Sequence, residues 1–176
     1  MRKLKNEELG RLSVEEFKEA EKAPIVIVLD NVRSLNNVGS AFRTGDAFLI
    51  EKLYLCGITG RPPHRDIQKT ALGAQDSVTW EHAPDSIALA ERLKEEGYTI
   101  VAVEQAENSV KLDRFEPEPG KKYALVFGNE VFGVDEKIVD TADIALEIPQ
   151  FGSKHSLNIS VSMGIVLWEV FKKIRL

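Results

Sequence analysis

Four polar side chains in the last third of the sequence have the types and positions expected of a binding or catalytic site. Asn129 and Glu130 lie in a glycine-bracketed loop directly after the apolar run 124–127, and Ser156 and Asn158 open the apolar segment that closes the chain. A hydrophobic core gains nothing from such groups, because burying an unpaired polar group costs about 1–3 kcal/mol. We therefore expect these residues to hold a polar ligand or a reacting group.

Several familiar catalytic patterns are missing from the sequence. Residues 128–133 have the glycine spacing of a phosphate-binding P-loop, but Val134 and Asp135 replace the Lys-Ser/Thr pair that should follow. No G-x-G-x-x-G motif opens a helix after the first strand, and no G-x-S-x-G nucleophile elbow occurs. The three histidines lack metal-ligand spacing. The sequence therefore lacks the residue patterns needed for metal, hydride-transfer or acyl-enzyme chemistry, and we expect no bound metal.

The elements that would position the polar residues alternate between strands and helices. Short apolar runs predict strands at about 25–29, 53–56, 77–80, 99–103, 124–127 and 144–146. Capping signals and helical spacing predict helices at about 13–22, 38–48, 84–96, 134–141 and 156–174. This alternation predicts an α/β fold with a mostly parallel sheet flanked by helices. Ligands bind outside the carboxyl ends of the strands in such sheets, and the polar clusters follow four predicted strand ends.

Composition indicates an ordinary globular domain. The chain has 176 residues, of which 43% are hydrophobic and 29% charged. Its single cysteine, Cys56, lies in an apolar run and excludes a disulfide framework within the chain. The N-terminus lacks an apolar signal core, and no run approaches membrane-spanning length. We expect a cytoplasmic protein with no membrane contact.

The charge distribution leaves two interpretations open. The formal net charge of −5 argues against broad electrostatic capture of nucleic acid. The segment 57–73 is nevertheless net positive, since it carries Arg61, Arg65 and Lys69 against one acidic residue. This segment either contacts a polyanion or is a solvated loop.

Three segments resemble, in order and spacing, the three motifs of the SpoU/TrmH RNA methyltransferases of the SPOUT superfamily. These segments are 37–44, 127–133 and 148–158, and the likeness covers about residues 24–173. Gln150 departs from the methionine that we would expect, which affects a side chain of the cofactor loop more than the chemistry. By this resemblance, residues 24–176 form a SPOUT methyltransferase domain and residues 1–23 an N-terminal helical extension.

The resemblance implies a fold and an activity that the pattern of elements could not reveal. It implies a deep C-terminal trefoil knot, which is a rare exception to the rules for chain connections. It also implies S-adenosylmethionine bound in that knot and a homodimer whose active site takes residues from both subunits. The reaction would transfer a methyl group to a ribose 2′-hydroxyl of tRNA or rRNA.

The motifs assign cofactor-binding positions by resemblance. These positions are Val103, Gly128, Ile148, Ser156 and Leu157. Three of them are apolar and could equally be part of the core. We expect Gly128 and Gly152 to let the main chain approach the adenosine closely.

The resemblance also assigns catalytic positions, which are Arg43, Asn37, Glu130, Ser156 and Asn158. Arg43 would lie by the phosphate and ribose of the target nucleotide. An arginine pKa above about 12 makes charge stabilisation a better role for it than proton removal. Arg43 could instead be a surface residue paired with Asp46, three positions further along its helix.

The other catalytic positions also have plainer interpretations. Glu130 would hold Arg43 or the partner subunit in place, or it is an exposed loop carboxylate. Asn37 could cap a helix, serve the site, or do both. Ser156 and Asn158 lie at the start of the last helix, where capping explains only one of them.

The last helix is apolar on more than one face, so that either a second subunit or the rest of the chain must cover it. Four basic residues are candidate RNA contacts: Arg33, Arg61, Arg65 and Lys69. The main alternative to a methyltransferase is a non-catalytic RNA-binding or assembly protein that retains the knotted fold. A generic nucleotide-binding α/β protein would instead prefer ATP or NAD to S-adenosylmethionine.

Overall fold

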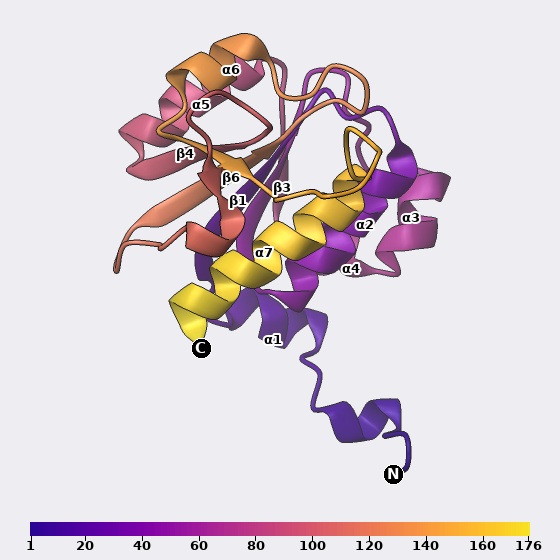
Figure 1. Cartoon of the computed structure of the whole chain (residues 1–176). Helices are drawn as coiled ribbons and strands as arrows, with labels where there is room; N and C mark the ends of the chain where they lie inside the picture. The colour runs from indigo at the N-terminus through magenta and orange to yellow at the C-terminus, as the bar shows by residue number, and fades with distance from the viewer.

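One seven-stranded sheet, parallel throughout, runs through the computed structural model, which describes residues 1–176 apart from the side chain of Asn6. The strand order is β3-β2-β1-β6-β4-β7-β5. Figure 1 labels β1, β3, β4 and β6 of this sheet. The strands are β1 (Ala23–Asp30), β2 (Ile50–Cys56), β3 (Trp80–Ala83), β4 (Tyr98–Val103), β5 (Val110–Lys111), β6 (Lys122–Phe127) and β7 (Ile144–Glu147). The predicted α/β architecture with a parallel sheet is confirmed.

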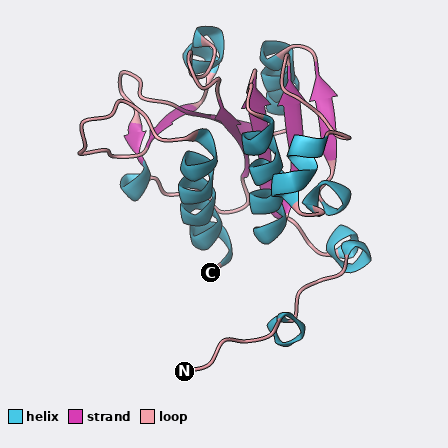
Figure 2. Ribbon diagram, turned by 90° about the vertical axis from the view of Figure 1, so that its right-hand side faces the viewer, coloured by secondary structure: helices cyan, strands magenta, loops and turns pink.

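Helices cover both faces of this sheet (Figure 2). They are α1 (Val14–Glu19), α2 (Leu35–Ala47), α3 (Arg65–Ala71), α4 (Ala74–Ser77), α5 (Ser86–Glu95), α6 (Glu136–Thr141) and α7 (Ile159–Arg175), with two 3-10 turns, η1 (Asn6–Leu9) and η2 (Leu112–Arg114). Helices α2 and α7 pack together on one face with α3 and α4, whereas α5 and α6 pack together on the other.

Strand β1 is buried on both faces, as its continuous apolar sequence predicts. It pairs with β2 on one side and β6 on the other. Ile27 and Leu29 belong to the core beneath α2 and α7, while Val26 and Val28 belong to the smaller core beneath α5 and α6. A strand whose alternate side chains enter two cores carries no solvated face, and its polar residues therefore come at its end.

A glycine on α2 allows α3 to pack closely beside it. A Cβ atom on Gly39 would lie 2.0 Å from Oγ1 of Thr70 and 2.4 Å from the carbonyl oxygen of Ile67. The Thr70 hydroxyl donates a hydrogen bond to the carbonyl of Asn36 at 3.0 Å. This close contact fixes α3 beside the first turn of α2, next to the carboxyl ends of the strands.

Several element boundaries differ from the predictions. The third strand is shifted to Trp80–Ala83, because residues up to Ser77 form the short helix α4. Helix α1 ends at Glu19, earlier than the predicted end at about residue 22. Its predicted capping box is present. The Ser13 side chain accepts a hydrogen bond from the Glu16 backbone at 3.1 Å, and the Glu16 carboxylate accepts one from the Ser13 backbone at 2.7 Å.

The structure shows which residues cap α2 and α7, two points that the sequence left open. Ser34 caps α2, since its side chain accepts a bond from the Asn37 backbone at 3.3 Å, so Asn37 is not the cap. Asn158 caps α7, since its side chain accepts a bond from the Ser160 backbone at 2.9 Å. Ser156 lies before the cap, and α7 therefore begins later than predicted.

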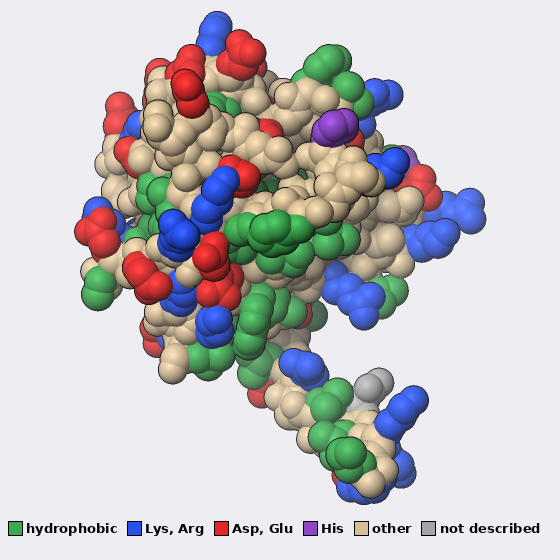
Figure 3. Space-filling view, in the orientation of Figure 1, with side chains coloured by type: hydrophobic (Ala, Val, Ile, Leu, Met, Phe, Trp, Pro, Cys, Tyr) green, Lys and Arg blue, Asp and Glu red, His purple; other side chains and the backbone are tan. Residues whose placement is uncertain are grey.

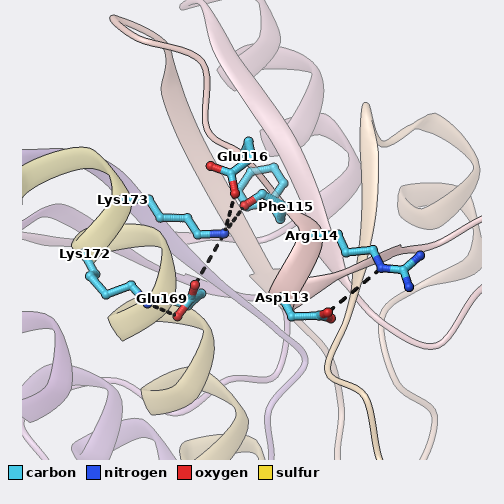
Figure 4. A network of polar contacts seen from close by, with 7 residues as sticks. All are labelled: Asp113, Arg114, Phe115, Glu116, Glu169, Lys172 and Lys173. Atoms are coloured by element: carbon cyan, nitrogen blue, oxygen red, sulfur yellow. Dashed lines mark hydrogen bonds and ion pairs between the residues drawn. The ribbon is translucent and has the colours of Figure 1, made fainter.

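Polar contacts tie the C-terminal end of α7 to the segment that follows η2 (Figure 4). The ammonium group of Lys173 donates to the carbonyl of Phe115 at 2.5 Å and to the carboxylate of Glu116 at 3.0 Å. It also pairs with Glu169, one turn earlier on α7, at 3.4 Å. These contacts hold the C-terminal end of α7 against the body of the protein.

The N-terminal segment is only partly packed against the rest of the protein, whereas Cys56 is fully buried. Residues 1–12 project away from the body (Figure 1), whereas Phe17 on α1 is buried in the larger core. Cys56 is buried as predicted, and burial raises the pKa of its thiol to about 12. No helix in the described part of the chain combines the length and apolar character needed to cross a membrane.

Candidate active site

A cleft opens at the carboxyl edge of the sheet, where loops following β4, β6 and β7 meet. It contains about 560 Å³ of empty space, part of it open to solvent. Its lining residues include Val103, Phe127, Gly128, Leu146, Ile148, Gln150, Ser156, Leu157 and Ile159. All five residues predicted to bind a cofactor thus line one cleft, although they come from three separate parts of the sequence.

The loop after β6 is a tight turn closed by two backbone hydrogen bonds. The Asn129 N–H donates to the Gly133 carbonyl at 2.8 Å, and the Gly133 N–H donates to the Asn129 carbonyl at 2.9 Å. A Cβ atom on Gly128 would lie 2.0 Å from the backbone of Gly133 and Val134. The turn itself therefore requires a glycine at position 128, and the predicted close approach of the adenosine to its main chain stays a prediction.

Gly152, the other glycine predicted to approach the adenosine, lies on a different loop. It lies in the exposed part of the loop that follows β7, and no heavy atom in the described structure lies within 4 Å of the position that its Cβ atom would take. It is not among the residues that line the cleft. The close approach of Gly152 to the adenosine stays a prediction.

Glu130 binds the segment that leads into α2. Its Oε2 accepts a hydrogen bond from the Arg33 backbone at 2.9 Å, and its Oε1 accepts one from the Ser34 backbone at 2.9 Å. Partial burial raises the pKa of Glu130, but these hydrogen bonds and one from the Asn37 side chain outweigh that effect, so the pKa is lowered overall. A carboxylate that accepts several N–H groups stays ionised and keeps its partners in place.

Two asparagines extend this contact into a chain of polar side chains. Nδ2 of Asn37 donates to Oε1 of Glu130 at 3.1 Å, and Nδ2 of Asn158 donates to Oδ1 of Asn37 at 3.4 Å. The three residues come from the loop after β6, the first turn of α2 and the cap of α7. Three of the five predicted catalytic residues are therefore connected, and Ser156 lines the adjoining cleft.

Arg43 is not brought to this cluster within the same chain. It lies on α2 six residues after Asn37, about 9 Å further along the helix axis, since each residue rises about 1.5 Å. Its side chain is exposed and lines a separate hollow with Ser13 and Asp46. Among the described residues it forms no ion pair with Asp46, whose carboxylate instead accepts a bond from Ser77 at 2.5 Å.

The predicted RNA contacts are all exposed on the side of the sheet edge near α2. Arg65 and Lys69 lie one turn apart on α3, and Arg61 lies in the loop that precedes this helix. Arg33 lies directly beside the carboxylate of Glu130 through its backbone N–H. The segment predicted as a loop is thus partly a helix, capped by a 3.1 Å bond from the Asp66 backbone to Nδ1 of His64.

Two residues that line the cleft are not among the predicted site residues. Glu104 and Gln105 directly follow the end of β4 and line the cleft. Nε2 of Gln105 donates to the carbonyl of His155 at 2.9 Å, joining the end of β4 to the loop that follows β7. The rule that ligands gather at the carboxyl ends of strands could have identified both residues, because Val103 was already assigned to the site. Within the part of the chain that the structure describes, no group of histidine, cysteine, aspartate or glutamate residues could hold a metal ion.

Comparisons with known proteins agree with this geometry. Residues 24–168 match the sequence model of the SpoU rRNA methylase family. The tRNA (guanosine(18)-2′-O)-methyltransferase of Thermus thermophilus is 31% identical over 162 residues, which cover 92% of this chain and 81% of that enzyme. A relative from Staphylococcus saprophyticus is 30% identical over 160 residues, which cover 91% of this chain but only 63% of its own length.

Two solved structures extend the comparison to the fold. An S-adenosylmethionine-bound rRNA methyltransferase from Sinorhizobium meliloti superposes with a TM-score of 0.80 at 25% identity, covering 89% of this chain and 59% of that one. The TrmH/SpoU tRNA modifying enzyme of A. aeolicus superposes with a TM-score of 0.80 at 28% identity, covering 91% of this chain and 81% of that one.

Proposed function

This chain belongs to the SpoU rRNA methylase family, and we propose that it is an S-adenosylmethionine-dependent methyltransferase acting on a ribose 2′-hydroxyl of tRNA or rRNA. One observation carries the proposal. The chain of Glu130, Asn37 and Asn158 directly adjoins the cleft lined by Gly128 and Ser156, so that all three family motifs meet at one place. Proteins similar to this chain include a tRNA 2′-O-methyltransferase and an rRNA methyltransferase with bound S-adenosylmethionine.

The lining of the cleft fits the methyl donor. Val103, Leu146 and Ile148 give it apolar walls that suit the faces of an adenine ring, and Ser156 adds a hydroxyl at its edge. The donor, when bound, supplies a methyl group on a positively charged sulfur. We propose that the five residues Val103, Gly128, Ile148, Ser156 and Leu157 hold it.

The polar chain of Glu130, Asn37 and Asn158 would act by positioning. Methyl transfer needs the ribose oxygen aligned with the methyl group, and holding two reactants in line can supply about 7–11 kcal/mol of the barrier. Glu130 fixes the start of α2, and Asn158 joins that point to the cap of α7. These contacts hold the edge of the cleft where a nucleotide would enter.

We infer that a second copy of the chain completes the site. Val161, Ile165 and Trp168 form a stripe along α7 that remains 39–49% exposed. Apolar side chains gather over α7 in the middle of Figure 3. Ile148 and Pro149 line a hollow beside Ile165 and Trp168, which makes the apolar face continuous with the loop of the cofactor cleft. A homodimer packed on this face would cover it.

The position of Arg43 supports the same inference. It is exposed on α2, which packs against α7, and it is separated from Asn37 of its own chain along the helix. An arginine supplied by the partner would reach the site across the shared face. Arg33, Arg61, Arg65 and Lys69 would contact RNA phosphates.

Further features follow from family membership as proposals. We propose that the segment after β7 threads through the loop after β6 as a deep trefoil knot. The bond from Gln105 to the His155 carbonyl, which ties that segment to the end of β4, is consistent with such packing. We also propose that residues 1–23 form an N-terminal extension to a methyltransferase domain over 24–176, and that the protein works in the cytoplasm.

Calorimetric titration and a methyl-transfer assay distinguish the proposed methyltransferase from the two alternative functions. The proposal predicts saturable binding of S-adenosylmethionine, with ATP and NAD binding much more weakly, and transfer of a labelled methyl group into RNA. Preference for ATP or NAD would favour a generic nucleotide-binding protein. Binding of RNA without any methyl transfer would favour the non-catalytic RNA-binding or assembly alternative.

A further inference from the structure

Glu104 presents a carboxylate to the cofactor cleft that no charged neighbour balances. It directly follows β4 and lines the cleft beside Gln105. The only other acidic residue of the lining, Glu147, pairs with Lys111 at 2.5 Å. Glu104 forms no ion pair with a described residue, so its negative charge remains available to a ligand.

The carboxylate of Glu104 is nevertheless held in a fixed orientation. Its Oε1 accepts a hydrogen bond from the Gln105 backbone at 2.9 Å, and its Oε2 accepts one from the Val134 backbone at 3.1 Å. Gly133 lies beneath it, and a Cβ atom there would come within 2.3 Å of Oε2. Gln105 follows the end of β4, and Gly133 and Val134 follow β6, so the carboxylate joins two walls of the same cleft.

The remaining hydrogen-bonding capacity of this group defines what it can bind. An ionised carboxylate offers about four acceptor positions and no donor. Two positions are used by the backbone, one on each oxygen, which leaves one on each oxygen for a ligand. Two acceptors on one rigid carboxylate match two neighbouring hydroxyl donors, as on the 2′ and 3′ carbons of a ribose.

We propose that Glu104 binds the ribose diol of the methyl donor and thereby selects a ribonucleoside cofactor; this inference rests on the function proposed above. Two apolar lining residues would then hold the adenine: Val103, which precedes Glu104, and Leu146, whose carbonyl accepts a hydrogen bond from the Glu104 N–H at 3.1 Å. Glu104 also links the end of β4 to the turn after β6 through Val134, so that diol binding and cleft shape depend on one side chain.

The test compares S-adenosylhomocysteine with its 2′,3′-dideoxy analogue by calorimetry. Hydrogen bonds to a charged group contribute about 1.5–3 kcal/mol, so the wild-type protein should bind the analogue roughly ten- to a hundredfold more weakly. Glu104→Gln should bind S-adenosylhomocysteine about tenfold more weakly and should discriminate much less between the two ligands. Glu107→Gln, which removes an exposed carboxylate from the same loop, is the matched control and should behave like the wild type.

The outcomes separate this inference from the proposed function. Equal affinity of the wild type for both ligands would overturn the diol contact, as would full discrimination by Glu104→Gln. Failure of the wild type to bind either S-adenosylmethionine or S-adenosylhomocysteine would instead overturn the proposed function itself. The wild-type comparison needs no mutation, so equal affinities would overturn the diol contact even if melting curves showed that Glu104→Gln is unfolded.

Discussion

Nδ2 of Asn37 donates a hydrogen bond to Oε1 of Glu130 at 3.1 Å, although 93 residues separate the two in the sequence. The contact joins the first turn of α2 to the turn after β6. Asn158, a further 28 residues along the chain from Glu130, extends it to the cap of α7 at 3.4 Å. The edge of the cleft is therefore held by polar contacts between segments that no local rule of sequence connects.

Replacing Glu130 should impair catalysis more than folding. Glu130→Ala removes the acceptor of the Arg33, Ser34 and Asn37 hydrogen bonds. Because Glu130 is exposed, the free energy of unfolding should fall by only about 1 kcal/mol. We expect kcat to fall at least about tenfold, which corresponds to about 1.4 kcal/mol of the barrier. Glu91→Ala, an exposed position on α5, is the control, and equal effects of the two changes would contradict this role.

The lowered pKa of Glu130 predicts a pH dependence of stability. The folded protein keeps this carboxylate ionised at a lower pH than the unfolded chain does, so its contribution is present in full above the ordinary glutamate pKa of about 4.3. The contribution is lost as the pH falls through the lower pKa of the folded protein. The difference in Tm between wild type and Glu130→Gln should therefore shrink below about pH 4. A difference that stays constant from pH 7 to pH 3 would rule out this linkage.

Arg43→Ala should abolish methyl transfer while leaving S-adenosylmethionine binding and the dimer intact. If the arginine serves the partner's site, then mixing Arg43→Ala with Glu130→Ala should restore activity, because one site of each mixed dimer receives both wild-type residues. Activity is measured before and after the two variants exchange subunits. Near-normal activity of Arg43→Ala alone would remove it from the mechanism, and failure of the mixture to regain activity would place Arg43 in its own chain's site.

The apolar stripe of α7 should be the dimer interface. Ile165→Asp places a charge on this stripe, and we expect it to convert the dimer to a monomer by light scattering after size exclusion. Ile58→Asp, which changes a side chain that is 67% exposed in the loop after β2, should leave the dimer intact. A dimeric Ile165→Asp variant, or a monomeric wild type, would contradict the assignment.

The basic residues on and before α3 should contribute to RNA affinity by charge. Neutralising Arg61, Arg65 and Lys69 together should weaken binding and flatten its dependence on salt, since each phosphate contact contributes about −0.9 to the slope of log K against log salt. The control neutralises Arg114, Lys121 and Lys122, which are exposed and lie outside α3. An unchanged slope for the first triple variant would show that Arg61, Arg65 and Lys69 are solvated residues that do not contact RNA phosphates.

The sequence predicted the sheet well because its central strands carry their own signal. Ile25 to Leu29 and Ala124 to Phe127 are continuous apolar runs, and both are buried strands in the structure. Short elements gave no such signal: α4 spans four residues and β5 only two, so neither completes a recognisable period. Their positions depend on packing against neighbours rather than on local preference.

The candidate site was predicted unevenly for the same reason. Motif spacing assigned five cofactor positions, and the structure brings all five to one cleft. It could not reveal that Ser34 rather than Asn37 caps α2, because both residue types favour that position. Motif spacing did not assign Glu104, which only the strand-end rule could have identified, and its orientation depends on the Gln105 and Val134 backbones.

The most direct test of the account is nucleoside mass spectrometry of RNA from a strain that lacks this protein. We predict that incubation with the purified protein and S-adenosylmethionine produces one 2′-O-methylated nucleoside in tRNA or rRNA, and that Glu130→Ala produces much less of it. Methylation found only on a base, or no methylated nucleoside in any RNA despite saturating S-adenosylmethionine, would contradict the account.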